Sequence, residues 1–400
     1  MSNVDNMNAA MAIPPILRLA FRPLFLGGTL FSIIAISWWA YFWAAPFDWQ
    51  PYGGPIWWHG HEMLFGFGSA IVVGFLLTAV QSWTGVPGLK GNKLAVLAVA
   101  WLLGRLLIAF GTSLPSVLVA LVDLSFLLLG ALAMAYPVVK AKQWRNLMFV
   151  PILLVLMLLN AVSHWGALTD NAAIALHSLH GATLLIALVI SIIGGRVIPF
   201  FTANASSYTR LPNIGWLDGL SIGSIIALVI VAFIGFSEVP ASLLAALSLL
   251  AAVSNGYRFL RWGIGHTLNT PLLWSLHFSY LFVPVGMIGL FLFSMGWLST
   301  ISIALHCFTV GAMGGMILSM ISRVTLGHTG RKLQPPKLMT LGYIFILAAA
   351  ALRVLLPGLL PSIANWGILG AAVLWVAAYS IYLFYYGPML LSTRADGRPG

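Results

Sequence analysis

The sequence predicts an all-α integral membrane protein with twelve transmembrane helices. Of its 400 residues, 60% are hydrophobic and only 7% carry a charged side chain, and the mean hydropathy is +1.00. A soluble protein is excluded, because its surface would need about 25% charged residues. At roughly 20 apolar residues per crossing, residues 1–400 form a single membrane domain with little chain left for extramembrane domains.

Twelve apolar runs are long enough to cross a bilayer. They are expected near residues 22–45, 57–83, 93–110, 114–139, 147–168, 172–200, 215–237, 241–260, 271–297, 299–323, 338–357 and 361–386. The first run is too long and too rich in tryptophan to be the core of a signal peptide, so we expect it to remain in the mature protein.

The distribution of basic residues predicts the orientation. If the N-terminus is cytoplasmic, all but two of the nineteen Lys and Arg residues fall in cytoplasmic tails, loops and helix ends. The two exceptions, Arg105 and Arg353, lie inside helices, and the opposite loops contain no Lys or Arg. The positive-inside rule then places both termini in the cytoplasm. It also explains the net charge of +11 without a nucleic-acid partner.

Histidines are concentrated in one layer of the predicted bundle. His277 is expected in the inner half of its helix, and His266 and His328 in cytoplasmic loops. Because burying an ionisable group in a membrane is costly, histidines within helices are functional-site candidates. At about 1.5 Å per residue from the outer end of each helix, six of the nine histidines fall in the outer, periplasmic half: His59, His61, His164, His177, His180 and His306.

The spacing of these histidines indicates which of them act together. His177 and His180 are three residues apart, so they share a helix face and can reach one metal or flank one ligand. His59 and His61 are about 200° apart on a helix, so they cannot share a site unless His59 still lies in the loop. Glu62 is a candidate to orient a metal-bound histidine by hydrogen bonding. The alternative is that each histidine is hydrogen-bonded between helices for structural reasons only.

The side chains available within the helices favour haem iron, copper or zinc. Imidazole suits these metals, whereas oxygen-preferring ions need carboxylates. Glu62 and Asp123 are the only obvious acids within the helices, which also argues against a transporter driven by a carboxylate relay. The single cysteine, Cys307, excludes an intramolecular disulfide and a cysteine-based zinc or iron–sulfur site.

The second, sixth and tenth helices resemble one another. Each runs from outside to inside, carries histidine in its outer half and ends in a polar segment. His180 lies sixteen residues before Arg196, and His306 lies seventeen residues before Arg323. This weak repeat predicts three arcs of four helices.

Three such arcs are similar to the catalytic subunit of haem–copper oxidases. The run His59-Gly60-His61-Glu62-Met63 fits the H-G-x-x-M pattern of the second helix there. However, the seventh helix has no histidine, and His306-Cys307-Phe308 stands in place of a paired H-x-H. A complete oxygen-reducing site is therefore not expected.

Five longer motifs, distributed from the first helix to the tenth, are more specific. They are Phe21–Leu26 (FRPLFL), Trp58–Phe67 (WHGHEMLFGF), Gly194–Thr202 (GGRVIPFFT), His306–Ala312 (HCFTVGA) and Ser322–Arg331 (SRVTLGHTGR). These motifs resemble the NnrS family. The resemblance implies a bacterial inner-membrane protein that carries haem and copper and takes part in the response to nitric oxide, in denitrifying or nitric-oxide-stressed cells.

From depth and spacing, we expect the histidine layer to hold the cofactors. His59 or His61, paired with His306, is the leading set of axial haem ligands. His177 with His180 is the leading copper or second-haem site.

Two further histidines and two arginines complete the candidate residues. His164 can join the metal site of the sixth helix, and His277 is another metal candidate. Arg196 and Arg323 lie about 25 Å away at cytoplasmic helix ends. There we expect them to anchor the helices or to meet lipid phosphate, and they would hold propionates only if a second haem lay near His277.

Several classes of function stay open at this point. One is an oxidoreductase that reduces nitric oxide or a related nitrogen oxide. Another is a non-catalytic haem and copper protein that binds, senses or buffers nitric oxide or protects metal centres. A third is a twelve-helix secondary transporter, favoured by the interruption at Gly194, Gly195 and Pro199 in the sixth helix. The sequence identifies no electron donor.

Overall fold

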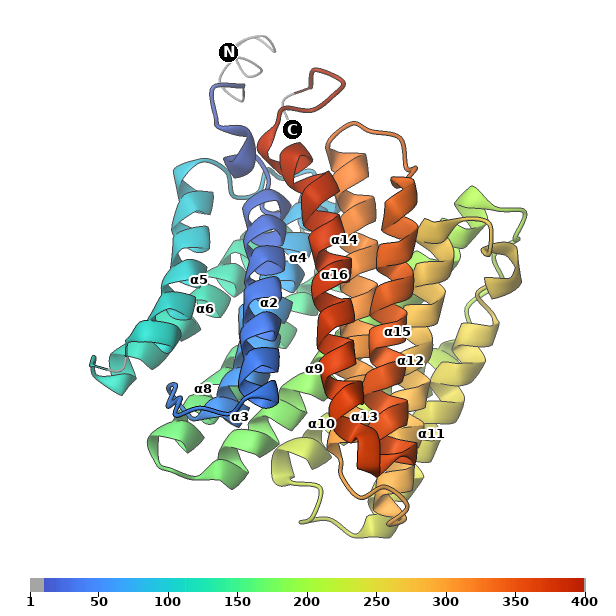
Figure 1. The fold of residues 1–400 in the computed structure, drawn as a ribbon. Helices are drawn as coiled ribbons and strands as arrows, with labels where there is room; N and C mark the ends of the chain where they lie inside the picture. Colours follow the sequence, from blue (N-terminus) through green and yellow to red (C-terminus); the bar gives the residue numbers. More distant parts are fainter. Residues whose placement is uncertain (1–10, 112, 399–400) are drawn as a thin grey trace.

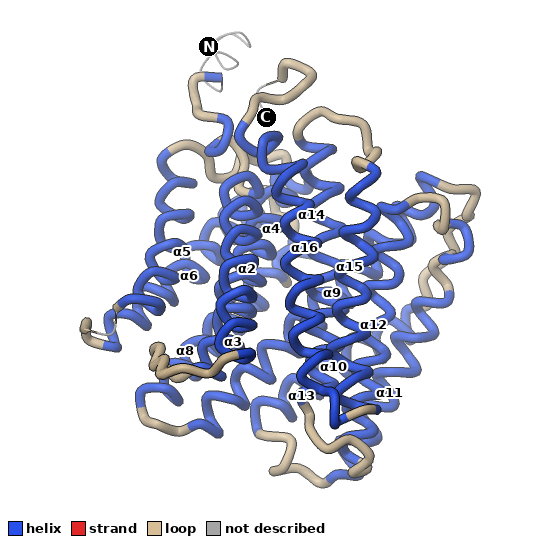
Figure 2. The backbone as a smooth tube through the Cα atoms, in the orientation of Figure 1, coloured by secondary structure: helices blue, strands red, loops and turns tan. Residues whose placement is uncertain are grey.

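The protein is a bundle of long helices that lie side by side (Figure 1). The computed structural model describes residues 11–111 and 113–398, and this part contains helices and loops but no strand (Figure 2). Twelve helical segments of the described chain are long and apolar enough to cross a membrane, which confirms the predicted fold class. We number these spans 1 to 12 in chain order.

The first six spans are α2 (Phe21–Ala44); α3 (Pro55–His61), η2 (Glu62–Gly68) and α4 (Ser69–Thr84) in one continuous span; α5 (Asn92–Phe110); α6 (Ser116–Lys140); α7 (Trp144–Leu147) with α8 (Phe149–Leu168); and α9 (Ala172–Ala205). The last six are α10 (Gly215–Ile234); α11 (Ala241–Leu260); α12 (Pro271–Ser294); α13 (Ser302–His306), η4 (Cys307–Gly314) and α14 (Gly315–His328) in one continuous span; α15 (Lys337–Leu359); and η5 (Pro361–Ile363) with α16 (Ala364–Leu391). Short 3-10 turns η1 (Pro15–Leu17) and η3 (Ile264–His266) lie outside the spans. His328, expected in a loop, is the last residue of α14.

Three spans form the inside of the bundle. In spans 2 and 10, 83% of the most apolar stretch is buried within the protein, and in span 6 the value is 67%. The nine other described spans range from 33% to 50%. The outer spans therefore supply most of the surface that faces lipid.

Each inner span packs against the outer spans of its own group of four. Span 2 contacts α2, α5 and α6; span 6 contacts α8 and α10, with α11 packed on α10; and span 10 contacts α12, α15 and α16. Contacts of α6 with α8, of α11 with α12 and of α16 with α2 close the three groups into a ring. This is the arrangement of three four-helix arcs that the weak repeat predicts.

Spans 2 and 10 each contain a π-helical segment directly after a histidine. In span 2 the segment is η2, which follows His61, and in span 10 it is η4, which follows His306. Glycines let neighbouring side chains approach η4 closely: a Cβ added to Gly311 would overlap Phe282, and one added to Gly314 would overlap Trp375. π-Helical turns within α-helices are frequent at functional sites.

The described ends of the chain lie at the same end of the bundle (Figure 1). The buried side chain of Arg22 joins them, because its Nη1 donates to the backbone oxygens of Leu390 (2.9 Å) and Ser392 (2.7 Å). The first and last spans are thereby connected, and the histidine-bearing segments α3 and α13 lie at the opposite end.

Candidate cofactor sites

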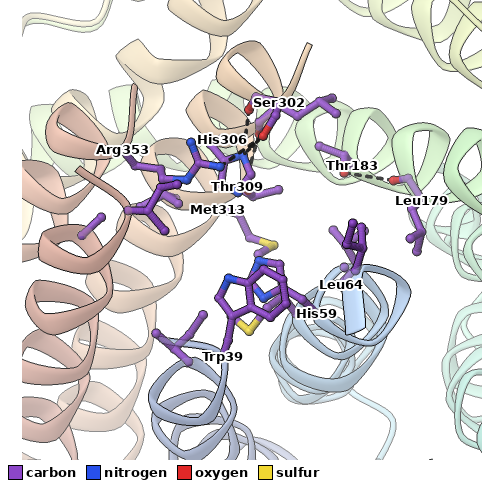
Figure 3. A pocket seen from close by; sticks show the side chains of 18 of the residues that line it. Trp39, His59, Leu64, Leu179, Thr183, Ser302, His306, Thr309, Met313 and Arg353 are labelled. Carbon is purple, nitrogen blue, oxygen red and sulfur yellow. Dashed lines mark hydrogen bonds between the residues drawn. The ribbon is translucent and has the colours of Figure 1, made fainter. Parts of the chain in front are cut away.

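A cavity of about 300 Å³ lies between the three inner spans, toward the end opposite the chain termini (Figure 3). Each inner span contributes one histidine to its wall: His59 from α3, His180 from α9 and His306 from α13. A fourth basic group, Arg353, comes from α15. An apolar cavity with a few converging polar groups is typical of a cofactor or ligand site. Much of the remaining wall is apolar and includes Met63, Leu64, Leu179, Val310, Met313 and Trp375.

The ring of His59 is held by stacking. It lies on the indole of Trp39 in span 1, with ring centroids 4.4 Å apart and planes inclined by 11°. The Nδ1 atom of His59 is buried and has no hydrogen-bond partner among the described residues. Because a buried polar atom without a partner costs free energy, this nitrogen is a candidate to bind a ligand.

Ser302 orients two of the basic groups in the cavity wall. The Nδ1 of His306 donates to the backbone oxygen of Ser302 at 2.7 Å, so Nε2 carries the lone pair of the neutral imidazole. The hydroxyl of Ser302 accepts from Nη2 of Arg353 at 3.1 Å. Within the described part of the chain, Arg353 forms no ion pair with a carboxylate.

The two histidines of span 6 have different surroundings. His180 lines the cavity, its ring centroid lies 5.7 Å from that of Phe236, and its buried Nδ1 has no hydrogen-bond partner among the described residues. His177 lies instead against Gly235, where an added Cβ would overlap the imidazole. His177 is not among the described residues that line the cavity.

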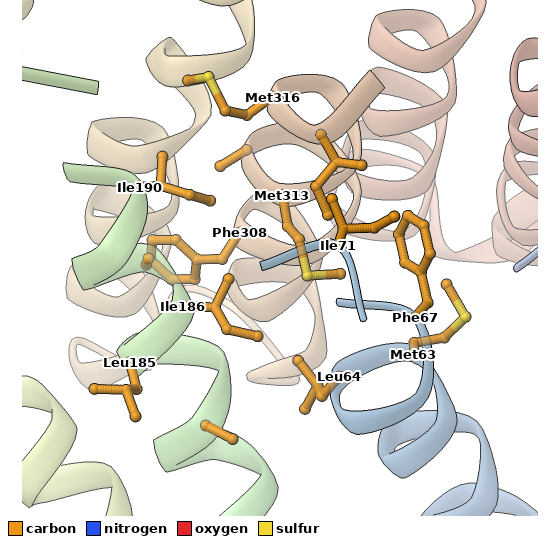
Figure 4. Close-up of a cluster of buried hydrophobic side chains, with 14 of the residues drawn as sticks. Met63, Leu64, Phe67, Ile71, Leu185, Ile186, Ile190, Phe308, Met313 and Met316 are labelled. Carbon is orange, nitrogen blue, oxygen red and sulfur yellow. The ribbon is translucent and has the colours of Figure 1, made fainter. Parts of the chain in front are cut away.

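On the side of the cavity that faces the chain termini, the inner spans pack through apolar side chains, several of which Figure 4 shows. A smaller cavity of about 70 Å³ in this region is lined by apolar residues, among them Met316 and Met320. Packed apolar side chains therefore close the histidine-lined cavity on the side that faces the chain termini. The side chains of this region include Met63, Leu64, Phe67, Ile71, Leu185, Ile186, Ile190, Phe308, Met313 and Met316.

A second group of ionisable and polar residues lies on the other side of span 2, toward spans 3, 4 and 5. Arg105 forms ion pairs with both carboxylates of this group: its Nε lies 3.4 Å from Glu62 Oε2, and its Nη2 contacts Asp123 Oδ1. All of the side chains in the group are buried. We call it the carboxylate–histidine cluster, and it consists of His61, Glu62, Arg105, Asp123, Asn160 and His164.

Both ring nitrogens of His61 face oxygen atoms. Nδ1 lies 2.8 Å from Glu62 Oε1, and Nε2 lies 2.9 Å from Asn160 Oδ1 and 3.3 Å from Asp123 Oδ2. A neutral imidazole has only one N–H donor. The second nitrogen therefore needs either a proton or a bound cation, and Glu62 makes the contact through which a carboxylate orients a ligand histidine.

His164 approaches the same carboxylate from span 5. Its Nε2 lies 3.1 Å from Asp123 Oδ2, and its Nδ1 lies 3.0 Å from the hydroxyl of Tyr52. Tyr52 lies in the loop before α3, and its burial, together with the Asp123 carboxylate, raises the pKa of Tyr52 to about 12. The phenol stays protonated at neutral pH, and its oxygen can still accept a hydrogen bond from Nδ1–H of His164, which leaves Nε2 facing Asp123.

Three possible ligand atoms converge in this cluster. One atom each of His61, Asp123 and His164 lie within 4.8 Å of one another, which is close enough to hold a metal ion. With both carboxylates ionised, their two negative charges exceed the single positive charge of Arg105. One further positive charge, a proton or a monovalent cation, would neutralise the cluster.

The remaining candidates from the sequence contribute to neither site. His277 has backbone oxygens at both ring nitrogens, at 3.0 and 3.3 Å. Arg323 lies over the ring of Phe201 at 3.7 Å, and Arg196 lies over that of Phe149 at 5.7 Å. These contacts hold the ends of spans 6 and 10 that lie farthest from the cavity.

Several residues of the two sites were not assigned from the sequence. Arg105 and Arg353 are visible there as basic residues inside helices, and a charge within a span is by itself a functional signal. Asn160, a polar side chain in an apolar run, gives a weaker signal of the same kind. Trp39 and Tyr52 give none, because their contacts join segments that are distant in sequence.

The fold and these sites define a multi-pass membrane protein whose inner helices enclose a histidine-lined cavity. The family model described as NnrS protein matches residues 15–394, nearly the whole chain. The chain therefore belongs to the NnrS family, as its motifs predict. No curated protein matches the sequence.

Proposed function

We propose that the chain is a haem- and copper-binding protein of the bacterial inner membrane that acts in nitric oxide metabolism or in defence against nitrosative stress. The observation that carries this proposal is the meeting of three histidines, one from each inner span, at one apolar cavity. Two of them have buried nitrogens without a partner among the described residues. Imidazole is a common axial ligand of haem iron, and membership of the family supports the same conclusion.

In this proposal the cavity is the haem site. His59 and His306, from spans 2 and 10, are the residues that would hold the haem through imidazole nitrogen, and His180 offers a third nitrogen in the same wall. Bound haem would supply an iron at which nitric oxide can coordinate. The two imidazole rings would be oriented before haem binds, because Trp39 stacks on the ring of His59 and the backbone oxygen of Ser302 accepts from that of His306.

The carboxylate–histidine cluster is the proposed copper site. His61, His164 and Asp123 would supply the ligand atoms, since imidazole nitrogen suits copper. Glu62 and Tyr52 hold the two rings through Nδ1, which is how metal-bound histidines are normally oriented. A copper(I) ion would supply the one positive charge that neutralises the carboxylate–histidine cluster.

A nitric-oxide-reducing oxidoreductase is the second candidate. The observation that favours it is His180, because this third imidazole in the cavity, whose Nδ1 has no partner among the described residues, could hold a second metal beside the haem. A secondary transporter is less well supported, because packed apolar side chains lie between the cavity and the end of the bundle that carries the chain termini (Figure 4).

The proposal is tested by the visible spectrum and metal content of the purified protein, prepared from cells supplied with a haem precursor and copper. We expect a Soret band that shifts when nitric oxide is added without oxygen, and we expect bound copper. Consumption of nitric oxide by the reduced protein would select the oxidoreductase, whereas a stable adduct would select the binding protein. A folded protein that contains neither cofactor, and takes up neither on reconstitution, would overturn the proposal.

A further inference from the structure

Arg353 is a cation within the bundle that the proposed function leaves without a role. The sequence places two basic residues inside helices, and the other one, Arg105, is paired with Glu62 and Asp123. Arg353 forms no ion pair in the described part of the chain, and its hydrogen bond there is to the hydroxyl of Ser302. The two arginines therefore differ in what neutralises them.

Burying a guanidinium in a membrane is costly unless its charge is compensated or its donors find acceptors. Arg353 lines the same cavity as the three histidines (Figure 3), so an anion bound there could compensate it. The guanidinium has five N–H donors in a planar fork, and Nη2 is the one that reaches Ser302. The fork matches a carboxylate, which can accept two parallel hydrogen bonds.

Ser302 links this cation to a proposed iron ligand. Its backbone oxygen holds His306, and its hydroxyl holds Arg353. A ligand that engages both residues must combine an acceptor for an imidazole lone pair with an anionic group. A porphyrin iron with free propionate side chains combines the two.

We propose that Arg353 binds a propionate carboxylate of the haem and makes this cavity selective for porphyrins that carry free carboxylates. The inference rests on the proposed function, because it requires that the cavity takes haem. A small inorganic anion or a lipid headgroup would also pair with Arg353, but neither would make porphyrin affinity depend on the porphyrin's own carboxylates.

The experiment compares ferric haem with its dimethyl ester, in which both propionates are neutral. The full chain is produced in haem-deficient cells, purified in detergent and titrated with each porphyrin while the Soret band is followed. We expect the wild-type protein to bind haem at least about tenfold more tightly than the ester. In Arg353→Gln the two affinities should become equal, and Arg353→Lys should recover part of the preference for haem.

Arg323→Gln is the matched control. It removes a guanidinium that lies over Phe201 at the far end of span 10, so it should keep the full preference for haem. Gel filtration of every variant confirms that it is folded before it is titrated.

Three results would overturn the inference. They are equal affinities of the wild-type protein for haem and ester, an undiminished preference for haem in Arg353→Gln, and an equal loss of both porphyrins in that variant. The first leaves the proposed function intact, because both porphyrins bind. If the wild-type protein binds neither porphyrin, the proposed function fails and the inference fails with it.

Discussion

His59 and His61, two residues apart in span 2, face two different sites. His59 lines the cavity between the inner spans, whereas His61 points into the carboxylate–histidine cluster and contacts Glu62. The divergence follows from the angle of about 200° between residues i and i+2 of a helix. Span 2 therefore carries one proposed ligand for each of the two proposed cofactors within one helical turn.

Replacing either proposed haem ligand should remove the Soret band. We expect His59→Ala and His306→Ala each to lower the haem content of the folded protein by at least about tenfold, since even the loss of a partner that only orients a metal ligand has effects of this size. His266→Ala, an exposed position in η3, is the control and should keep the band. An unchanged spectrum in folded His306→Ala would eliminate span 10 as a source of ligands.

The two histidines of span 6 should differ in their effect on the cofactors. His180→Ala changes the cavity wall, so we expect a shifted Soret band or a loss of haem. His177→Ala affects a side chain that lies against Gly235 and should leave the haem and copper content per folded molecule unchanged. If both variants lost the same metal, the two histidines would share one site, and the separation of their roles would be wrong.

The copper content of the protein should depend on residues of the carboxylate–histidine cluster and not on residues of the cavity wall. We expect His164→Ala to lose copper and to keep haem, as measured by metal analysis and the Soret band on the same sample. Glu62→Gln should weaken copper binding by about 10–100-fold, because it removes the group that orients His61. His277→Ala is the matched control, because it removes a buried histidine held by backbone oxygens, and it should keep its copper. If folded His164→Ala also kept its copper, the cluster would not be the copper site.

The contributions of Arg105 and Asp123 to the free energy of unfolding should be strongly coupled, because the two side chains form a buried ion pair. Asp123→Asn should lower the free energy of unfolding by about 3–5 kcal/mol, because it leaves a buried guanidinium with one carboxylate. In the metal-free protein in detergent, the double variant Arg105→Gln/Asp123→Asn should lose less than the sum of the two single losses.

Asp218→Asn is the comparison for that experiment. Asp218 lies 2.8 Å from Nε of Arg258 and is 31% exposed, so solvent screens its ion pair and its loss should cost less. Strictly additive losses for Arg105 and Asp123 would contradict the coupling.

The orientation in the membrane can be tested with reporters. A reporter fused after Gly400 should be cytoplasmic, and one inserted beside Glu238, in the loop after α10, should be periplasmic. The reason is the division of Lys and Arg between the two sets of loops. A periplasmic C-terminus would invert the bundle and move the histidine-lined cavity to the cytoplasmic half.

The architecture could be predicted because its signals are local. Each span is an apolar run, and the histidines of spans 2, 6 and 10, together with their polar ends, mark the helices that become the inner ones. The motif Phe21–Leu26 is also recognisable from the sequence alone. The hydrogen bonds of its Arg22 to Leu390 and Ser392 are not, because they join opposite ends of the chain.

The detailed site could not be predicted, because it depends on contacts between distant segments. Trp39 reaches His59 from span 1, and Arg353 reaches Ser302 from span 11; neither contact leaves a periodic pattern in the sequence. The spacing of His177 and His180 predicts a common helix face, but it does not specify what packs against each end of that face. Those neighbours become known only when the spans are arranged in space.

The seventeen residues from His306 to Arg323, against sixteen from His180 to Arg196, amount to a one-residue insertion in span 10. The corresponding stretch of α9 is α-helical throughout, whereas span 10 contains η4, and a π-helical turn takes in one more residue than an α-helical turn. The insertion is thus absorbed at η4 and leaves the register of the rest of the span undisturbed. If η4 became α-helical while keeping all of its residues, the extra residue would rotate His306 by about 100° about the helix axis, out of the wall that it shares with His59.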